Sequence, residues 1–150
     1  MKLSPHFSLA EFTNSATARR LGIANGPTLD HIEAMGHLSR AVLEPVREQF
    51  GRPVRITSGY RCPALSRAVG SSARSQHCKG QAADFEIAGV SNLAVATWIR
   101  DNLRFDQLIL ENYVRGDPNS GWIHCSYRPD RARHSVLTYT RRKYWKGLVA

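Results

Sequence analysis

The chain has 150 residues, of which 42% are hydrophobic and 22% charged, the composition of an ordinary globular protein with a buried core. We predict one domain, residues 1–150, because no repeat, low-complexity tract or linker-like stretch divides the sequence. No apolar run is long enough to span a bilayer. Pro5 and Glu11 interrupt the apolar core that a secretory signal would need. We therefore expect a monomer that is synthesised in the cytoplasm.

The net charge is +9, from 21 basic and 12 acidic residues, and much of the excess lies near the C-terminus. The basic residues there are Arg128, Arg131, Arg133, Arg141, Arg142, Lys143 and Lys146, with Asp130 as the only acid among them. Net charge sets the sign of a partner and not its identity. This region is therefore either an anionic-envelope surface, a nucleic-acid surface or a solvated basic face. Nucleic acid is the least favoured, because no groove-binding helix motif is present.

The first third of the chain has helical patterns. Ser8 and Glu11 have the spacing of a capping box, which predicts a short helix after Ser8. A second short helix is expected over Ala16–Leu21. The longest helix begins near Thr28, and its apolar residues recur at helical spacing up to residue 50. Pro45 lies inside this pattern and predicts a kink there.

Strand patterns dominate after residue 53. We predict strands over residues 54–57, 82–87, 107–111 and 122–127, an edge strand over 134–140, and helices over 64–69 and 92–103. Helices come first and strands later, which favours an α+β fold. We expect the N-terminal helices to pack on a small antiparallel sheet.

Residues 75–84, SQHCKGQAAD, contain His77 and Asp84, and a later strand-like run, GWIHCSY, contains His124. Two imidazoles and one carboxylate are the ligand set of a catalytic zinc site, in which the fourth position stays open. Strand alternation places Asp84 and His124 on faces that can meet, and a turn at Gly80 brings His77 to them. We therefore predict a Zn²⁺ site formed by His77, Asp84 and His124.

Three cysteines, Cys62, Cys78 and Cys125, cannot all pair with one another, and we expect free thiols. Cys78 and Cys125 directly follow the two histidines and were considered as ligands. Cys125 should face away from whatever His124 faces, because neighbours in a strand point to opposite sides. Cys78 belongs to no CxxC pair. We interpret all three as small buried side chains.

A metal hydrolase also needs a carboxylate to transfer protons, and Glu111 is the first candidate. If the strands over residues 107–111 and 122–127 pair with Ile109 opposite His124, then Glu111 lies opposite Trp122 on the face of His124. A slip of one residue would place Glu111 on the other face. The alternative for Glu111 is a structural carboxylate bonded to backbone donors or to Arg115.

Other polar residues near these motifs are candidates with open roles. Glu86 is the second candidate base. Arg61 can clamp a substrate carboxylate or stabilise an oxyanion, or it can form a structural salt bridge. Ser75 either holds the His77 loop or contacts substrate, while Gln76 can offer its amide to a peptide. Trp122, on the predicted face of His124, is a further candidate for substrate binding.

Three motifs together resemble a known family. SGYR at residues 58–61, SQHCKGQAAD at 75–84 and WIH at 122–124 closely resemble the zinc D-alanyl-D-alanine carboxypeptidases, which share their fold with lysostaphin-type peptidases and the hedgehog signalling domain. The lead-in, with HFSLAEF, NGP and VLEPVR, resembles a branch of small phage and bacterial peptidases. The resemblance covers nearly the whole chain.

The resemblance implies roles for individual residues. It makes His77, Asp84 and His124 the zinc ligands, and it assigns Arg61 to substrate or transition-state binding. Several relatives carry the catalytic carboxylate just before the last zinc histidine, but residues 121–123 are Gly, Trp and Ile here. In this branch a glutamate that ends the preceding strand takes its place, and Glu111 matches it.

The resemblance also implies a substrate. The family cleaves peptide bonds in the stem peptides of bacterial peptidoglycan, so we expect either a D-alanine carboxypeptidase or an endopeptidase acting at L-alanyl-D-glutamate or another D-amino-acid bond. A phage lysis enzyme of the endolysin type, which reaches the wall after release through a membrane pore, fits this reading. The alternative is a catalytically silent envelope-binding or phage-tail module on the same fold.

Overall fold

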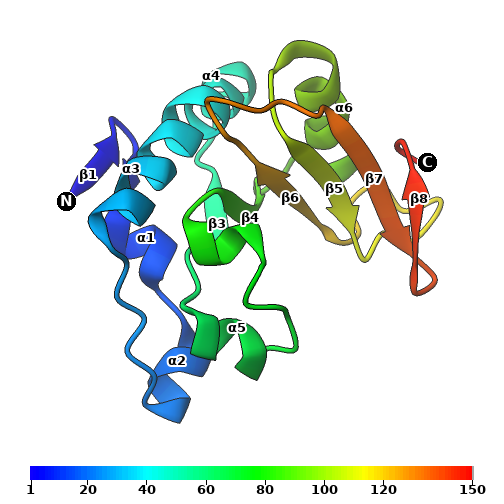
Figure 1. Cartoon of the computed structure of the whole chain (residues 1–150). Coiled ribbons are helices and arrows are strands. Elements are labelled where there is room, and N and C mark those ends of the chain that lie inside the picture. The colour runs from blue at the N-terminus through cyan, green and yellow to red at the C-terminus, as the bar shows by residue number, and fades with distance from the viewer. Residues whose placement is uncertain (150) are drawn as a thin grey trace.

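The computed structural model describes residues 1–149, in which eight strands form two sheets. A small hairpin joins β1 (Lys2–Ser4) to β2 (Phe7–Ser8). The other strands are β3 (Arg55–Ser58), β4 (Ala82–Glu86), β5 (Gln107–Glu111), β6 (Trp122–Ser126), β7 (Ser135–Thr140) and β8 (Lys143–Lys146). They form one sheet in the order β3-β4-β6-β5-β7-β8 (Figure 1). The α+β class is confirmed, and the β1–β2 hairpin was not predicted.

The helices lie close to where the sequence places them. They are α1 (Leu9–Thr13), α2 (Ala16–Leu21), α3 (Leu29–Leu38), η1 (Ser39–Leu43), α4 (Glu44–Phe50), α5 (Pro63–Ala68), η2 (Gln76–Lys79) and α6 (Asn92–Asn102). At the start of α1 the backbone N–H of Ser8 donates to Glu11 Oε2 at 2.7 Å, the bond expected of a capping box. No helix among the described residues combines the length and apolar character that a membrane crossing requires.

Proline changes the long helix in a specific way. Pro45 has no N–H to offer the carbonyl four residues earlier. The chain just before it widens into the π-helical segment η1, where the N–H of Glu44 donates to the carbonyl of Ser39. The disturbance expected at Pro45 therefore appears as a π turn between α3 and α4, a common site of helix bending.

The sheet is mixed, which corrects the prediction of a purely antiparallel sheet. β5 and β7 are parallel, with Gln107 opposite Ser135, while the other neighbours are antiparallel. The chain leaves β6 at Ser126, which lies opposite Gln107 at the beginning of β5, so the next strand starts beside that same end. The strand predicted over residues 134–140 is also not at the edge, because β8 pairs with its outer side.

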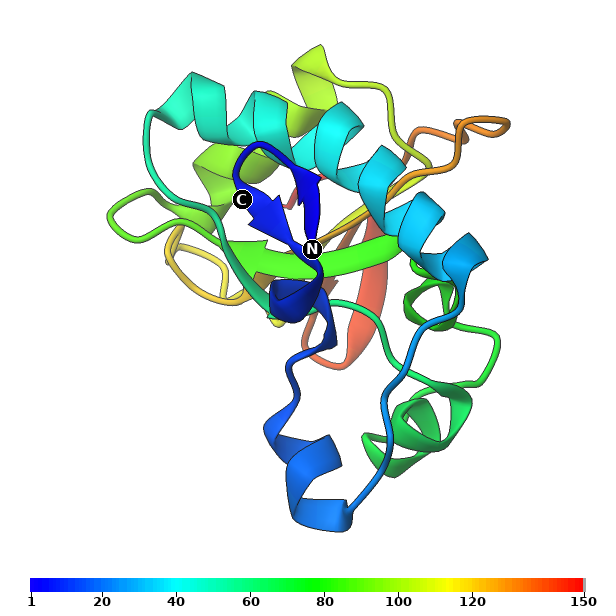
Figure 2. The same ribbon diagram turned by 90° about the vertical axis from the view of Figure 1, so that its left-hand side faces the viewer.

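The core lies between one face of the sheet and the helices α3, α4 and α6 (Figure 2). Strand alternation supplies the sheet's share of this core, since Phe85 of β4 and Ile123 and Cys125 of β6 are fully buried. Their neighbours Asp84 and His124 therefore lie on the opposite face. The packing of one face thus orients polar side chains on the other.

Candidate metal centre and active site

Three adjacent strands present the predicted polar residues on one face. In the observed register Asp84 of β4 lies directly opposite His124 of β6, which in turn lies opposite Ile109 of β5. Two residues further along, Glu111 lies opposite Trp122. This is the register that the sequence analysis assumes for β5 and β6, and it places Glu111 on the face of His124.

His77 reaches the same place from the short helix η2. The Ser75 hydroxyl accepts a hydrogen bond from the His77 backbone N–H at 3.2 Å, so Ser75 holds this loop in the first of its two predicted roles. Gly80 ends η2 with a φ of +70°, and a Cβ there would lie 2.4 Å from the carbonyl oxygen of His31. Glycine is therefore required for the chain to turn from His77 into β4.

The His77 imidazole is oriented by the backbone. Its side chain is 2% exposed, and its Nδ1 lies 2.7 Å from the carbonyl oxygen of Gly59. A carbonyl can only accept, so Nδ1 carries the proton and Nε2 presents a lone pair. Burial lowers the pKa of His77 and so favours the neutral imidazole, the form that binds metals.

The donor atoms of His77, Asp84 and His124 all lie within 4.8 Å of one another. Asp84 Oδ1 is 3.0 Å from His124 Nδ1 and 3.3 Å from His77 Nε2. Burial alone would raise the pKa of Asp84, but its close contacts with His124 and His77 hold that pKa well below its usual range. Two imidazole nitrogens and one carboxylate therefore converge, and this is a donor set that zinc favours.

The cysteines stand apart from this cluster. All three are free; Cys78 and Cys125 are buried, and Cys62 is partly buried. Cys125 packs in the core on the opposite face of the sheet from His124. The Cys78 thiol is directed toward the carbonyl oxygen of Ser72, at 3.8 Å. The cluster that can hold a metal includes no thiol.

A cavity of about 390 Å³ opens over the cluster. It is lined by the predicted ligands and by every other residue assigned to the site except the second candidate base, Glu86. The lining residues are Arg61, Ser71, Ser75, Gln76, His77, Asp84, Gln107, Ile109, Glu111, Trp122, His124 and Tyr144. Tyr144, from the basic and aromatic C-terminal segment, is the aromatic wall residue that sequence reasoning missed. Its link to the site depends on β8, which was not predicted.

Glu111 lines this cavity. Neither a backbone donor nor Arg115 bonds its carboxylate among the described residues, so the predicted alternative role does not apply. Burial is the main cause that raises the pKa of Glu111 above its ordinary value. The reserve candidate Glu86 instead pairs with Arg55 at 3.2 Å and does not line the cavity.

Arg61 also lines the cavity. Its Nη1 donates to Ser58 Oγ at 3.2 Å, while the buried Nε has no hydrogen-bond partner among the described residues. No carboxylate of that part of the chain lies within salt-bridge distance of its guanidinium. A buried N–H without an acceptor is rare, so the arginine retains donors for a group that enters the cavity.

Behind the site lies a buried network that the sequence did not reveal. The amide of Gln76 donates to Asp106 Oδ2 at 3.0 Å; Gln76 also lines the cavity, so its role toward a peptide stays a prediction. Arg131 and Arg133 donate to the same carboxylate. These contacts join segments 25 to 30 residues apart and hold the residue preceding His77.

Comparison with known proteins agrees with this geometry. The family model described as peptidase M15 matches residues 5–126, more than three quarters of the chain. The site is one that can hold a metal, and the chain belongs to the peptidase M15 family, the zinc metallopeptidases that resemble D-alanyl-D-alanine carboxypeptidases. No curated protein matches the chain. Residues 127–150 lie beyond the matched region.

Proposed function

We propose that this chain is a zinc-dependent peptidase that hydrolyses an amide bond in the stem peptides of bacterial peptidoglycan. The observation that supports it most is the convergence of His77, Asp84 and His124 beneath a cavity in which the Glu111 carboxylate bonds to no other residue of the described range 1–149. Membership of the peptidase M15 family supports the same reaction class.

His77 Nε2, His124 Nδ1 and an Asp84 oxygen would hold the metal. Zinc in such a site acts as a Lewis acid toward a carbonyl and increases the acidity of water. The hydrogen bond from His77 Nδ1 to the Gly59 carbonyl keeps the ligating nitrogen directed at the cluster. Asp84 contributes the negative charge that makes the donor set complementary to a divalent cation.

Glu111 is the proton carrier in this proposal. Its carboxylate accepts a proton from the attacking water and later delivers it to the amine of the leaving group. The half-buried position supports this role, because burial raises the pKa of the carboxyl toward the range in which it both accepts and releases a proton.

Arg61 and Trp122 position the substrate. The unpaired guanidinium of Arg61 donates to the oxyanion that develops on the scissile carbonyl, or to a carboxylate next to it. Trp122 lies beside Glu111 in the sheet and offers an apolar surface to the peptide. Both residues hold the amide over the metal cluster.

We extend the proposal to a phage lysis enzyme that reaches the wall after release from the cytoplasm. The net charge of +9 supports it, because a strongly basic protein is attracted to an anionic cell envelope. The scissile bond is either that of a terminal D-alanine or an internal bond beside a D-amino acid.

Mass spectrometry of purified peptidoglycan after digestion tests the function and identifies the bond. New amino and carboxyl termini should appear with the zinc-loaded protein and disappear with a chelator. His77→Ala should lose both the metal and the activity. Cys78→Ser is the matched control, because Cys78 is adjacent in sequence but outside the cluster, and it should keep both. Binding to peptidoglycan without new termini would refute the proposal in favour of a silent wall-binding module.

A further inference from the structure

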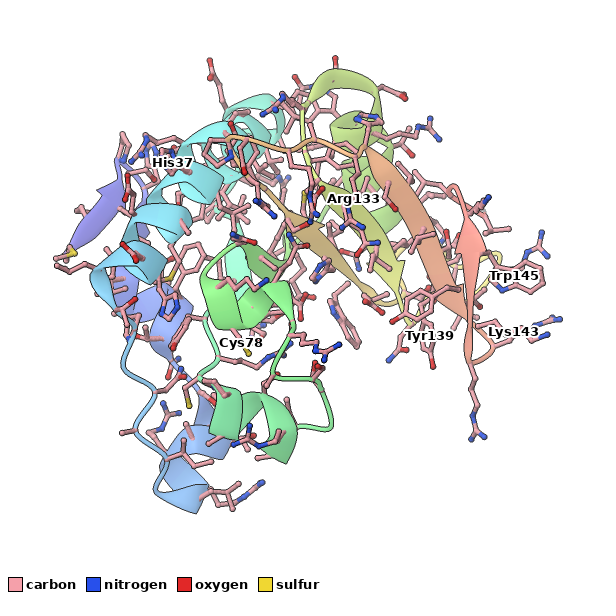
Figure 3. All side chains as sticks on the ribbon, viewed as in Figure 1. His37, Cys78, Arg133, Tyr139, Lys143 and Trp145 are labelled. Atoms are coloured by element: carbon pink, nitrogen blue, oxygen red, sulfur yellow. The ribbon has the colours of Figure 1, made fainter. Side chains whose placement is uncertain are left out.

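The hairpin β7–β8 lies beyond the region that the family model matches, yet it extends the sheet that carries the site. Its outer strand β8 is exposed along its whole length. Figure 3 shows Lys143 and Trp145 pointing away from the body of the molecule. Residues on alternate positions of β8 point to the opposite face, so Tyr144 and Lys146 lie on the other side from Lys143 and Trp145.

The register shows that this other side is the face of the active site. Ile109 of β5 lies opposite Leu137 of β7, and Leu137 lies opposite Lys146 of β8. Tyr139 lies opposite Tyr144, and their ring centroids are 4.6 Å apart. The face that presents Ile109 and Glu111 therefore continues across β7 into the Tyr139–Tyr144 pair and Lys146.

Tyr144 also connects the hairpin to the cavity directly. Its side chain lines the cavity together with Glu111 and Trp122, although the residue remains 59% exposed. A large aromatic side chain that is exposed at the rim of a cavity has not been buried by folding, and its surface is available to a ligand. Tyr144 thus forms a wall on the β8 side of the site, and Tyr139 packs against its ring.

The charge of the hairpin is uniformly positive. Asp130 is the last acidic residue in the sequence, and Arg141, Arg142, Lys143 and Lys146 follow it. Among residues 1–149, no carboxylate forms a salt bridge with any of these four. The turn residues Arg141 and Arg142 have φ values of +51° and +62°, a conformation in which Asn and Gly are strongly preferred. Two arginines at this turn are therefore not explained by backbone preference.

We propose that the β7–β8 hairpin is a substrate-recognition wall, in which Tyr139 and Tyr144 contact the peptide and Lys146 binds a carboxylate of it outside the scissile bond. This inference rests on the proposed peptidase function. β6 and β8 are separated by three strand spacings, about 14 Å. An extended peptide covers this in about four residues. Because a lysine side chain is long enough to span part of this distance, the carboxylate belongs to a residue about two to four positions from the cleaved amide.

The positions of Lys146 on the site face and Lys143 on the outer face of β8 favour an acidic peptide substrate over a general polyanion. A polyanion would use all the exposed cations of the hairpin, including Lys143 on the outer face. A peptide that lies across the site would meet Lys146 and the tyrosine pair on the site face, and not Lys143. Lys143 and Lys146 carry the same charge, belong to the same strand and are both exposed, so they form a matched pair for a test.

The test compares the zinc-loaded wild type with Lys146→Gln, Lys143→Gln and Tyr144→Ala on two soluble stem peptides, one with its free carboxylates and one amidated at them. Lys146→Gln should lower kcat/KM about fivefold on the acidic peptide, the effect of one exposed charge pair, and leave the amidated peptide unaffected. Tyr144→Ala should lower kcat/KM about tenfold on both. Lys143→Gln should match the wild type.

The outcomes separate this inference from the function on which it rests. If the wild type cleaves neither peptide nor intact peptidoglycan, both are overturned. If the wild type cleaves them and Lys146→Gln does so equally well, only the recognition wall is overturned. Equal losses in Lys143→Gln and Lys146→Gln would also overturn it and indicate a general polyanion surface. Because both lysines are exposed, their variants should retain the wild-type melting temperature.

Discussion

Replacing Asp106 by Asn should destabilise the protein by removing the charge at the centre of the buried network. The Asp106 side chain has no exposed surface and accepts hydrogen bonds from Arg133 at 2.8 and 2.9 Å, from Arg131 at 3.1 Å and from Gln76 at 3.0 Å. Breaking a fully buried ion pair costs about 3–5 kcal/mol. The side chains of Arg131 and Arg133 are 46% and 45% exposed and can return to water. We therefore expect Asp106→Asn to lower the free energy of unfolding by about 2–3 kcal/mol.

Thermal unfolding followed by circular dichroism measures this loss. At this chain length 1 kcal/mol corresponds to about 2–4 °C, so Tm should fall by about 4–12 °C at pH 7. Burial alone would raise the pKa of Asp106, but the hydrogen bonds from Arg133 and Arg131 hold that pKa well below its usual range. Its contribution is therefore complete above the unfolded-state pKa of about 3.9 and is lost as the pH falls further.

The difference in Tm between wild type and Asp106→Asn should consequently stay constant from pH 8 to pH 5 and shrink below about pH 4. Asp101→Asn is the control, because the Asp101–Arg100 pair is exposed and its loss should leave Tm unchanged. An unchanged Tm in Asp106→Asn, or a difference as large at pH 3 as at pH 7, would show that the network does not stabilise the fold through its charge.

Two further predictions concern the proposed proton carrier. Glu111→Gln should retain zinc, measured by elemental analysis, and lose about 10²- to 10⁴-fold in kcat. Glu86→Gln is the control and should keep full activity, because Glu86 pairs with Arg55 outside the cavity. Full activity in Glu111→Gln would remove Glu111 from the mechanism. Gly121→Ala should lower both Tm and activity, because Gly121 has a φ of +70° and a Cβ there would lie 1.9 Å from the Glu111 carbonyl oxygen. An active Gly121→Ala variant with the wild-type Tm would contradict this reasoning.

The centre of the site follows from local sequence pattern. The period of two in a strand is enforced by the core, because a slip of one residue in β6 would bury His124 and expose Ile123. The same constraint fixes Asp84 on β4 and Glu111 on β5. Sequence therefore suffices to place these three residues on one face and to set Cys125 apart from them.

The surroundings of the site depend on information that local pattern lacks. The parallel pairing of β5 with β7 is determined by where the chain returns after β6, and β8 has no buried face that would produce a periodic signal. The Asp106 network likewise joins residues that are far apart in sequence. Tyr144 was not predicted because β8 gives no periodic signal. The hydrogen bond from Gln76 to Asp106 was not predicted because the two residues are far apart in sequence.

The location of Glu111 and the lack of a carboxylate just before His124 are consequences of one backbone arrangement. The carbonyl oxygen of Glu111 occupies the space that a Cβ at position 121 would need, 1.9 Å away. The Gly121 carbonyl is in turn held by Asn92 Nδ2 at 2.8 Å, so this segment cannot simply withdraw. A side chain at position 121 would force the end of β5 to move and carry Glu111 with it. A carboxylate side chain at position 121 and the present placement of Glu111 are therefore mutually exclusive.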